Sequence, residues 1–440
     1  MKKEQLKQKV CAAIDKRADE IIAIGDFMFN NPELGYKELQ AAALVEEKFQ
    51  ALGLEYRKGL AITGLKSRLP GRQSKLSVAV MGEMDAVVCH DHPHADPNTG
   101  AAHSCGHNAQ TAMMVGVAMG LVDSGVMDEL DGDVVFMALP AEEYVELDYR
   151  QKLRREGKIA FLGGKQELLK LGEFDDIDMA MMCHLASNHP ERQMLIPGPG
   201  IGSTGFIGKT IKYVGKEAHA GGAPHEGINA LNAAMLGLMG IHANRETFKD
   251  ADSIRVHPII TKGGDLVNII PADVRIETYV RGRSIDAIMD AGQKVNRALQ
   301  AGAMAVGAEA IIDEIPGYLP LFNDEQLATL FASNCAELLG TAGVIPAEPM
   351  AGSTDMGDIT HIMPGIHPSV GGVTGSAHAR DYLIVDPDMA YVVPAKAMAM
   401  TVIDLLFDQA TVGREIKEAF KPAMTKDEYL AMWENLLVIK

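Results

Sequence analysis

The sequence predicts an α/β fold: a mainly parallel central sheet flanked by helices, interrupted by a smaller inserted βαββαβ domain. Short, nearly continuous apolar runs alternate with helical segments in the first part of the chain, a pattern typical of the central strands of a parallel sheet. Near residue 200 glycine and proline concentrate, and the segments beyond alternate apolar and polar residues instead. This change of pattern indicates a domain boundary.

The first part of the chain supplies the elements of the parallel sheet. Apolar residues at helical spacing predict two helices in the first fifty or so residues, separated by the turn NNPELGY (30–36). Three apolar runs follow, LSVAVMG (76–82), DVVFMALP (133–140) and IDMAMMCH (177–184), with a helix at 109–125 between the first two. The order strand, helix, strand predicts parallel pairing.

The inserted domain is predicted from the elements that follow the boundary. In chain order these are a strand at 206–215, a helix at 228–244, strands at 253–264 and 274–282, a helix at 285–307 and a strand at 308–315. A βαββαβ order of about 110 residues fits a four-stranded antiparallel sheet with two helices on one face. We therefore expect three ranges, 1–202, 203–315 and 316–440, of which the first and third form one domain.

Charge and cysteine content limit the partners and the compartment. The 440 residues include 41 Lys and Arg against 59 Asp and Glu, a formal net charge of −18, so we expect neither a nucleic-acid nor a membrane partner, but a small molecule or peptide. Charged or polar residues interrupt every stretch as long as the eighteen or so apolar residues of a membrane span. Five scattered cysteines predict reduced thiols, and we expect a cytoplasmic protein.

One glycine motif raises a different class of function. GIGSTG (200–205) satisfies the G-x-G-x-x-G pattern of nucleotide-dependent oxidoreductases. That motif requires a strand before it and a helix after it, whereas here IPGP precedes it and a strand pattern follows. A hinge between domains is the better interpretation.

The segment HDHPHADPNTGAAHSCGHNAQ (90–110) carries the first candidate metal ligands. Cys105 and His107 lie in a glycine-containing turn directly before an apolar helix, where both side chains can face one cation. Sulfur beside imidazole favours zinc-like metals. His90, His92 and His94 lie in a polar loop, where we expect them to be solvated.

Other ionisable residues follow the predicted strands. Asp85 follows the first apolar run, Glu142 and Glu143 the second, and His184 ends the third. In open α/β sheets the ligand crevice lies at the carboxyl ends of the strands, so these groups should converge with Cys105. Two adjacent carboxylates repel each other unless a cation separates them or one takes a proton. One can then bind metal while the other handles a proton.

These residues resemble the motifs of the aminoacylase-like zinc/manganese metallopeptidase and amidohydrolase family, in particular its amidohydrolase branch. That branch contains p-aminobenzoyl-glutamate hydrolases, hippurate hydrolases and auxin-conjugate amidohydrolases. The resemblance runs over nearly the whole chain, through GEMDAV (82–87), HSCGHN (103–108), PAEE (140–143), MMCHL (181–185), AHAGGAPHEGINAL (218–231), GGDLVNIIPADVRIETYVRGRS (263–284) and GSAHARDY (375–382).

The resemblance implies a zinc-exopeptidase-like catalytic domain, formed by 1–202 and 316–440, and a ferredoxin-like lid and dimerisation domain at 203–315. It also implies two divalent metal ions, Zn or Mn, in the catalytic domain. Carried over by position, the metal ligands are Cys105, which is shared between the ions, His107, Glu143, His184 and His378.

The resemblance also assigns catalytic and substrate-binding roles. Glu142 falls on the general base, and Asp85 on the acidic residue that orients the site. His219 corresponds to the lid histidine that hydrogen-bonds the reacting carbonyl, often from a partner subunit, which implies a homodimer through the lid domain. Asn268 and Arg281 match lid positions that hold a substrate carboxylate.

The implied activity is hydrolysis of an amide bond to an amino acid. Substrates would be N-acyl, aroyl or peptidyl amino acids, such as a p-aminobenzoyl-glutamate-like compound or a dipeptide. The alternative is a non-catalytic relative that binds peptides or metal, and retention of Glu142 argues against it because a pure binder needs no proton acceptor.

The sequence departs from the family pattern at two places. Glu83 stands where relatives carry Asp or His, and a charged insertion, which should be helical, lies at 144–172. These departures concern the substrate rather than the class of reaction.

Overall fold

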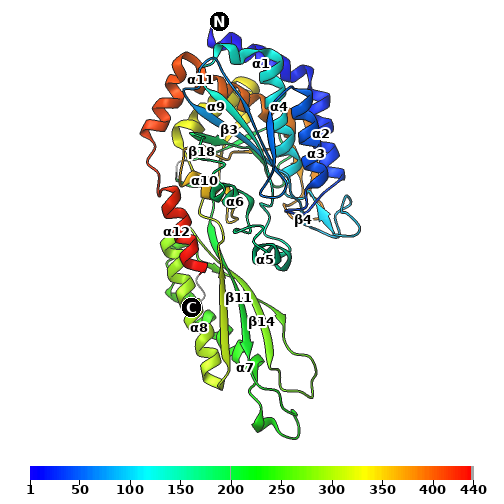
Figure 1. The fold of residues 1–440 in the computed structure, drawn as a ribbon, viewed down its shortest axis with the longest axis vertical. Helices are drawn as coiled ribbons and strands as arrows, with labels where there is room; N and C mark the ends of the chain where they lie inside the picture. The colour runs from blue at the N-terminus through cyan, green and yellow to red at the C-terminus, as the bar shows by residue number, and fades with distance from the viewer. Residues whose placement is uncertain (199, 438–440) are drawn as a thin grey trace. The chain divides into compact units, whose positions relative to one another are not determined.

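The computed structural model describes residues 1–198 and 200–437, and it divides into two compact units (Figure 1). The first unit comprises Met1–Gly202, Phe322–Pro349 and Asp358–Met424. The second comprises Ser203–Leu321, Met350–Gly357 and Thr425–Lys440.

A six-stranded sheet forms the centre of the first unit. Its strand order is β1 (Tyr56–Leu60), β2 (Gly64–Leu69), β6 (Asp133–Leu139), β3 (Ser77–Glu83), β7 (Met179–Met181) and β18 (Gly365–Ile366). The four strands from β6 to β18 are parallel, and β1 and β2 add an antiparallel hairpin at one edge. The predicted α/β class with a mainly parallel sheet is confirmed.

A smaller sheet continues the first unit beyond the central one. It consists of β17 (Val344–Ala347), β9 (Met194–Pro197), β19 (Ser369–Val370) and β8 (His184–Leu185). Strand β8 pairs with β19 in parallel, with His184 opposite Ser369. His184 therefore lies on a hydrogen-bonded strand, although the sequence placed it at the end of the third apolar run.

Helices cover the central sheet of the first unit (Figure 1). They include α1 (Lys3–Lys16), α2 (Ala18–Asn30), α3 (Leu39–Ala51), α4 (His107–Ser124), α9 (Glu325–Leu339) and α11 (Val393–Ala419). Three helices open the chain where two were predicted, because Arg17 (φ −102°, ψ 4°) leaves the helical conformation and separates α1 from α2. Among the described residues, Asp388–Ala419 alone is apolar and long enough to cross a membrane, and 89% of its most apolar window is buried.

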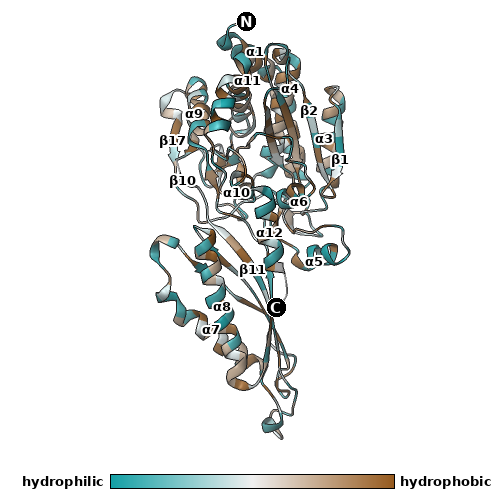
Figure 2. Cartoon of the chain, turned by 60° about the vertical axis from the view of Figure 1, so that its left-hand side comes forward, coloured by the Kyte–Doolittle hydropathy of each residue, from teal (hydrophilic) through white to brown (hydrophobic). Residues whose placement is uncertain are grey.

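Helix α4 lies at the centre of the first unit's core. Nearly all its residues are buried, so it lacks the polar face of a surface helix. A Cβ at Gly120 would meet the side chain of Ile14, so glycine allows α1 to approach closely. Figure 2 shows apolar, brown-coloured residues on the neighbouring strands of the central sheet. The helix that begins at His107 is therefore held rigidly from all sides.

The second unit has the predicted βαββαβ order. Its antiparallel sheet runs β12 (Arg255–Val256), β14 (Asp273–Gly282), β11 (Gly205–Val214) and β15 (Glu309–Ile315), and β13 (Ile259–Lys262) also pairs with β14. Helices α7 (Ala230–Asn244) and α8 (Ile285–Val306) complete it. The single strand predicted at 253–264 is divided because Pro258 has no N–H to donate to the ladder.

The second unit includes segments that the sequence assigned to the larger domain. These are 316–321, 350–357 and 425–440. Helix α12 (Lys426–Leu437) joins this unit because Met432 and Trp433 line an apolar pocket together with Phe206 and Ile288. Apolar contacts between residues distant in sequence, which periodicity does not reveal, decide this grouping.

The fold predicts unequal costs for two leucine truncations in the first unit. Leu121 of α4 is fully buried, whereas Leu39 at the start of α3 is 69% exposed. Leu121→Ala should lower the free energy of unfolding by about 2–5 kcal/mol, because it removes buried methyl groups and leaves a cavity. Leu39→Ala is the matched control and should change it little. Urea denaturation measures both, and equal losses would contradict this packing.

Candidate metal centre

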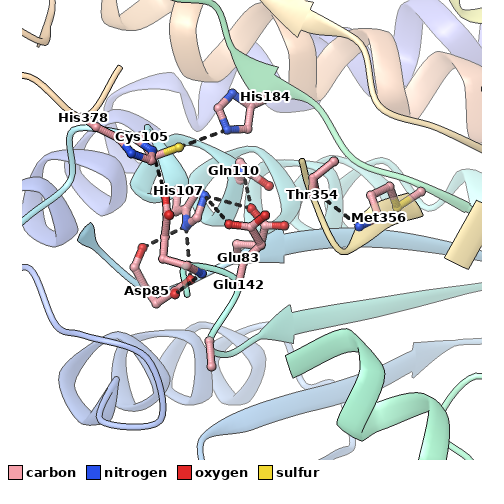
Figure 3. Close-up of polar contacts among 12 residues, drawn as sticks. Glu83, Asp85, Cys105, His107, Gln110, Glu142, His184, Thr354, Met356 and His378 are labelled. Atoms are coloured by element: carbon pink, nitrogen blue, oxygen red, sulfur yellow. Dashed lines mark hydrogen bonds and ion pairs between the residues drawn. The ribbon is translucent and has the colours of Figure 1, made fainter. Parts of the chain in front are cut away.

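The carboxyl ends of the parallel strands bring the candidate residues of the first unit together (Figure 3). Asp85 follows β3, Glu142 and Glu143 follow β6, and His184 follows β7. Parallel strands end at one edge of the sheet, so residues distant in sequence meet there. The four carboxyl and imidazole groups converge on the start of α4, as the sequence predicted.

His107 is the first residue of α4, and Asp85 fixes its ring. The preceding Gly106 has φ 89°, and a Cβ at this position would also meet the Tyr382 hydroxyl. The His107 Nδ1–H donates to the Asp85 main-chain oxygen (2.9 Å) and to its Oδ1 (3.1 Å). Nδ1 therefore carries the proton, and Nε2 is presented to the site, the arrangement usual for a metal-bound histidine. Asp85 Oδ2 also accepts from the Glu143 N–H (2.8 Å), so one carboxylate orients two predicted ligands.

Three ligand atoms gather around the thiol on one side of the site. Those of Cys105, His107 and His184 all lie within 4.8 Å of one another. The His184 Nδ1–H donates to the Leu185 main-chain oxygen (2.6 Å), which leaves Nε2 3.5 Å from the Cys105 Sγ (Figure 3). Both imidazoles are thus anchored through Nδ1 to a main-chain oxygen, which leaves Nε2 for the site.

A second group of three ligand atoms shares the same thiol. Those of Cys105, Glu143 and His378 also lie within 4.8 Å of one another, and His378 Nε2 is 3.2 Å from Glu143 Oε1. His378 has φ 63°, and its N–H donates to the Ser104 oxygen, which holds this loop against the site. Hydrogen bonds to Cys105 and Glu143 raise the pKa of His378 to about 11. All five predicted ligands therefore fall into two groups joined by Cys105.

Glu83 belongs to a third group, together with His107 and Glu142. Glu83 Oε2 is 3.0 Å from His107 Nε2 and accepts from Gln110 Nε2 (2.7 Å). Its other oxygen forms an ion pair with Lys165, whose side chain is fully buried. Lys165 supplies the positive charge that Glu83 needs, and this supports leaving Glu83 outside the predicted ligand set.

The electrostatics of the site favour the ionised forms of its sulfur and carboxyl groups. Burial acts to raise the pKa of the Cys105 thiol, but the imidazoles of His184 and His107 help to lower it to about 6. A thiolate is the form that binds metal. Burial also acts to raise the pKa of Glu83, but Lys165 and His107 hold it well below its usual value.

The residues fit divalent cations. His107 Nε2 and Glu143 Oε1 are buried, and each lies beside another potential ligand atom: Glu83 Oε2 is 3.0 Å from the first, and His378 Nε2 is 3.2 Å from the second. Carboxylates and a thiol gathered this closely repel one another unless a cation separates them, and a divalent cation would do so here. One thiolate, three imidazoles and one carboxylate form a donor set suited to zinc-like metals.

Two of the three predicted lid residues of the second unit lie on neighbouring loops. His219 is exposed, and its Nδ1 accepts from the Gly222 N–H (2.9 Å), so the neutral ring carries its proton on Nε2. The Asn268 main-chain oxygen accepts from the Ala220 N–H (2.9 Å). The predicted roles of His219 and Asn268 stay predictions.

Arg281, the third predicted residue of the second unit, lies on β14. Its Nη1 donates to the Ser353 Oγ (2.7 Å), and its guanidinium stacks over the ring of Phe206 at 5.0 Å from the centroid. These contacts hold the Arg281 side chain in place. Its predicted role in binding a substrate carboxylate stays a prediction.

Some functional candidates escaped the sequence analysis. His367 is 6% exposed, its ring centroid is 5.5 Å from that of His184, and neither ring nitrogen has a hydrogen-bond partner. It follows β18, which is too short for periodicity to reveal. Lys165 was included in an insertion whose role was left open.

Of the three loop histidines that were predicted to be solvated, His90, His92 and His94, one is buried. His90 and His94 are exposed, as predicted for solvated loop residues. His92 is 4% exposed, because its ring packs on Phe29 and its Nε2 lies 2.9 Å from the main-chain oxygen of Tyr382. His92 therefore supports the loop rather than facing solvent.

Comparison with known proteins gives a consistent family match. The family described as peptidase family M20/M25/M40 matches residues 79–398, a range that includes all five predicted ligands. The Xaa-Arg dipeptidase of Mus musculus is 27% identical over 451 residues, covering 97% of this chain and 95% of the relative. The N-acyl-L-amino acid amidohydrolase of Geobacillus stearothermophilus is 25% identical over 335 residues, covering 74% and 83%.

Solved structures share the fold. The Bacillus subtilis YXEP protein, described as a dinuclear metal binding peptidase from the M20 family, superimposes with a TM-score of 0.67 and 22% identity. The match covers 89% of this chain and 99% of that one. The likeness supports the fold of both units.

The shared thiol predicts different consequences for two ligand substitutions. Cys105→Ser should weaken the binding of both metal ions, whereas His378→Ala should weaken the binding of one ion. We expect each affinity to fall by more than about 100-fold, because removing a residue that only supports a metal ligand already lowers metal affinity by about 10–100-fold. Metal titration with Zn²⁺, followed by metal analysis of the protein, distinguishes the two patterns. Cys89→Ser, which removes a free thiol outside both groups, is the control. If Cys105→Ser affected one ion only, the thiol would not be shared.

Proposed function

The chain belongs to peptidase family M20/M25/M40 and is a metal-dependent hydrolase of amide bonds, and we propose that its substrate is an N-acyl, aroyl or peptidyl amino acid with a free carboxylate. A dipeptide or a p-aminobenzoyl-glutamate-like compound has this chemistry. The observation that carries the proposal is the arrangement of two ligand groups around Cys105 with Glu142 beside them. The relatives named as a dipeptidase and an N-acyl amino acid amidohydrolase support this substrate class.

Two divalent ions, Zn or Mn, would be held by the two ligand groups that share Cys105. When bound, they would lower the pKa of water and polarise the amide carbonyl. Asp85 holds the His107 ring and the Glu143 main chain in register for this. Glu142, 7% exposed and adjacent to the ligands, accepts the proton of the attacking water and returns it to the leaving amine.

The second unit supplies the remaining groups in this proposal. The Nε2–H of His219 is the donor that stabilises the developing oxyanion, because its Nδ1 is already occupied as an acceptor. In this proposal His219 belongs to the second unit of a partner subunit, and it acts once a closed state has excluded water from the site. Asn268 and Arg281 would bind the substrate carboxylate, for which the planar guanidinium is well suited.

Substitution of the proposed base tests the reaction. Glu142→Gln should reduce hydrolysis by about 10²–10⁴-fold, the usual contribution of a general base, while metal content stays at the wild-type level. Purified, metal-loaded protein is assayed against acyl-amino acids, dipeptides and aroyl-glutamates. Glu156→Gln, an exposed glutamate in the neighbouring insertion, is the matched control. Undiminished hydrolysis by Glu142→Gln would refute the mechanism, and wild-type protein inactive on the whole panel would favour a non-catalytic binder.

A homodimer through the second unit forms part of the proposal. Helix α7 exposes Met235 (52%), Leu236 (41%) and Met239 (64%), and the edge strand β13 exposes Ile259 (53%) and Ile260 (43%). Apolar groups of this size in one small unit support a protein interface. Antiparallel strand edges also pair readily with a second copy.

Charge substitution on α7 tests this assembly. The double variant Met235→Lys/Met239→Lys should shift the protein from dimer to monomer in light scattering, because two buried charges without partners would oppose association. Leu39→Lys, on an exposed leucine of the first unit, is the control and should leave the dimer intact. A dimer that survives the double variant would exclude α7 from the interface.

The cytoplasmic location also belongs to the proposal. All five cysteines are free thiols in the structure, which suits a reducing compartment. The net charge of −18 supports a protein that acts on small molecules or peptides and has no nucleic-acid or membrane partner.

A further inference from the structure

A buried arginine underlies the catalytic glutamate pair. Arg150 lies on α5 (Leu147–Arg155), a short helix of the charged insertion, and it is among the largest fully buried side chains of the protein. Arginine is seldom fully buried unless it is paired. Its burial in an otherwise highly polar helix therefore calls for a specific role.

The Arg150 guanidinium binds three main-chain carbonyl oxygens. Nη1 donates to the Leu162 oxygen (2.7 Å) and to the Ala141 oxygen (3.3 Å), and Nη2 donates to the Glu143 oxygen. The guanidinium also stacks over the ring of Tyr36, at 5.4 Å from the centroid. Two of these three carbonyls flank Glu142.

The backbone that Arg150 binds is strained. Ala141 has φ 55°, a left-handed conformation in which the Cβ of a residue with a side chain crowds the following carbonyl oxygen. Strand β6 ends at Leu139, so the residues beyond it have left the sheet ladder. Strained backbone persists at functional sites only where the surroundings hold it.

The surroundings hold Ala141 from both sides. Its N–H donates to Glu38 Oε1 (2.8 Å), and its oxygen accepts from the Gly164 N–H (3.1 Å) as well as from Arg150. Glu38 is fully buried, like Arg150. A Cβ at Gly35 would meet both Arg150 Nη2 and the Ala141 Cα, so little room exists for the guanidinium to shift.

From these contacts we propose that Arg150 is a positioning residue for the metal centre. It fixes the main chain at 141–143, so that Glu143 reaches the ligand group of Cys105 and His378 while Glu142 is held in place to act on water. The insertion thereby serves the active site rather than an outer surface. This inference rests on the proposed roles of Glu142 and Glu143.

The geometry requires arginine rather than any cation. A guanidinium presents five N–H donors in a rigid planar fork, which can reach carbonyls of three different residues at once. A lysine ammonium carries its donors on one atom and cannot span them. Arg150→Lys therefore keeps the charge but loses the positioning.

Cobalt binding and kinetics test the proposal in the full-length protein. Arg150→Lys and Arg150→Met are compared with wild type by Co²⁺ titration, followed through the visible absorption of the bound ion. In both variants we expect one of the two Co²⁺ ions to bind about 10–100-fold more weakly, the usual effect of removing an outer partner of a metal ligand, with an altered spectrum. The value of kcat should fall by about 100-fold while KM changes by less than about twofold, because a misplaced base slows chemistry and not binding. Arg155→Met, an exposed arginine of the same helix, is the matched control and should behave as wild type.

Several results would overturn the proposal. The proposal fails if Arg150→Lys binds both Co²⁺ ions with wild-type affinity and has a wild-type kcat. It also fails if a variant loses both bound ions in proportion to its loss of folded protein. If Arg150→Met fails to fold, Arg150→Lys decides, and failure of both to fold would assign Arg150 a purely structural role. Wild-type protein that binds two Co²⁺ ions but hydrolyses none of the panel would contradict the proposed function, while the cobalt readout would still decide the role of Arg150.

Discussion

The structure depends on how four buried carboxylates are compensated at one edge of a parallel sheet. Glu83, Asp85, Glu142 and Glu143 are each at most 8% exposed. Such a concentration of negative charge is unfavourable unless cations or hydrogen bonds balance it. Lys165 balances Glu83, His107 and the Glu143 N–H bind Asp85, and His378 pairs with the Glu143 carboxylate. The same side chains that compensate the carboxylates therefore also set the geometry of the candidate metal centre.

The sequence predicted the parts of this centre that follow long, regular elements. Asp85, Glu142 and His184 follow apolar runs, so the rule that strand ends converge was sufficient to group them, and Cys105 was placed by the helix that follows it. The assignment of His378 came from the family resemblance, because its loop has no regular pattern. Strand β18 has only two residues, and nothing local marks His367 as buried beside His184. Long-range burial is invisible to periodicity.

The insertion at 144–172 shows the same limit. It was predicted to be helical, and α5 and α6 (Gly164–Lys170) are present, but its charged composition did not indicate which side chains are buried. Two of its cationic side chains, those of Arg150 and Lys165, are fully buried: Arg150 binds the Glu143 main-chain oxygen, and Lys165 pairs with the Glu83 carboxylate. Which charged side chains of a polar helix turn inward is decided by partners far along the chain. The two inward-facing cations make this insertion part of the site.

The most direct measurement of the central claim is anomalous diffraction from crystals of the protein loaded with Zn²⁺. We expect two peaks. One should lie within bonding distance of the ligand atoms of Cys105, His107 and His184, and the other within bonding distance of those of Cys105, Glu143 and His378, with a Zn–S distance of about 2.3 Å for both. A single peak, or one held by Glu83 and Glu142 in place of Cys105, would contradict it.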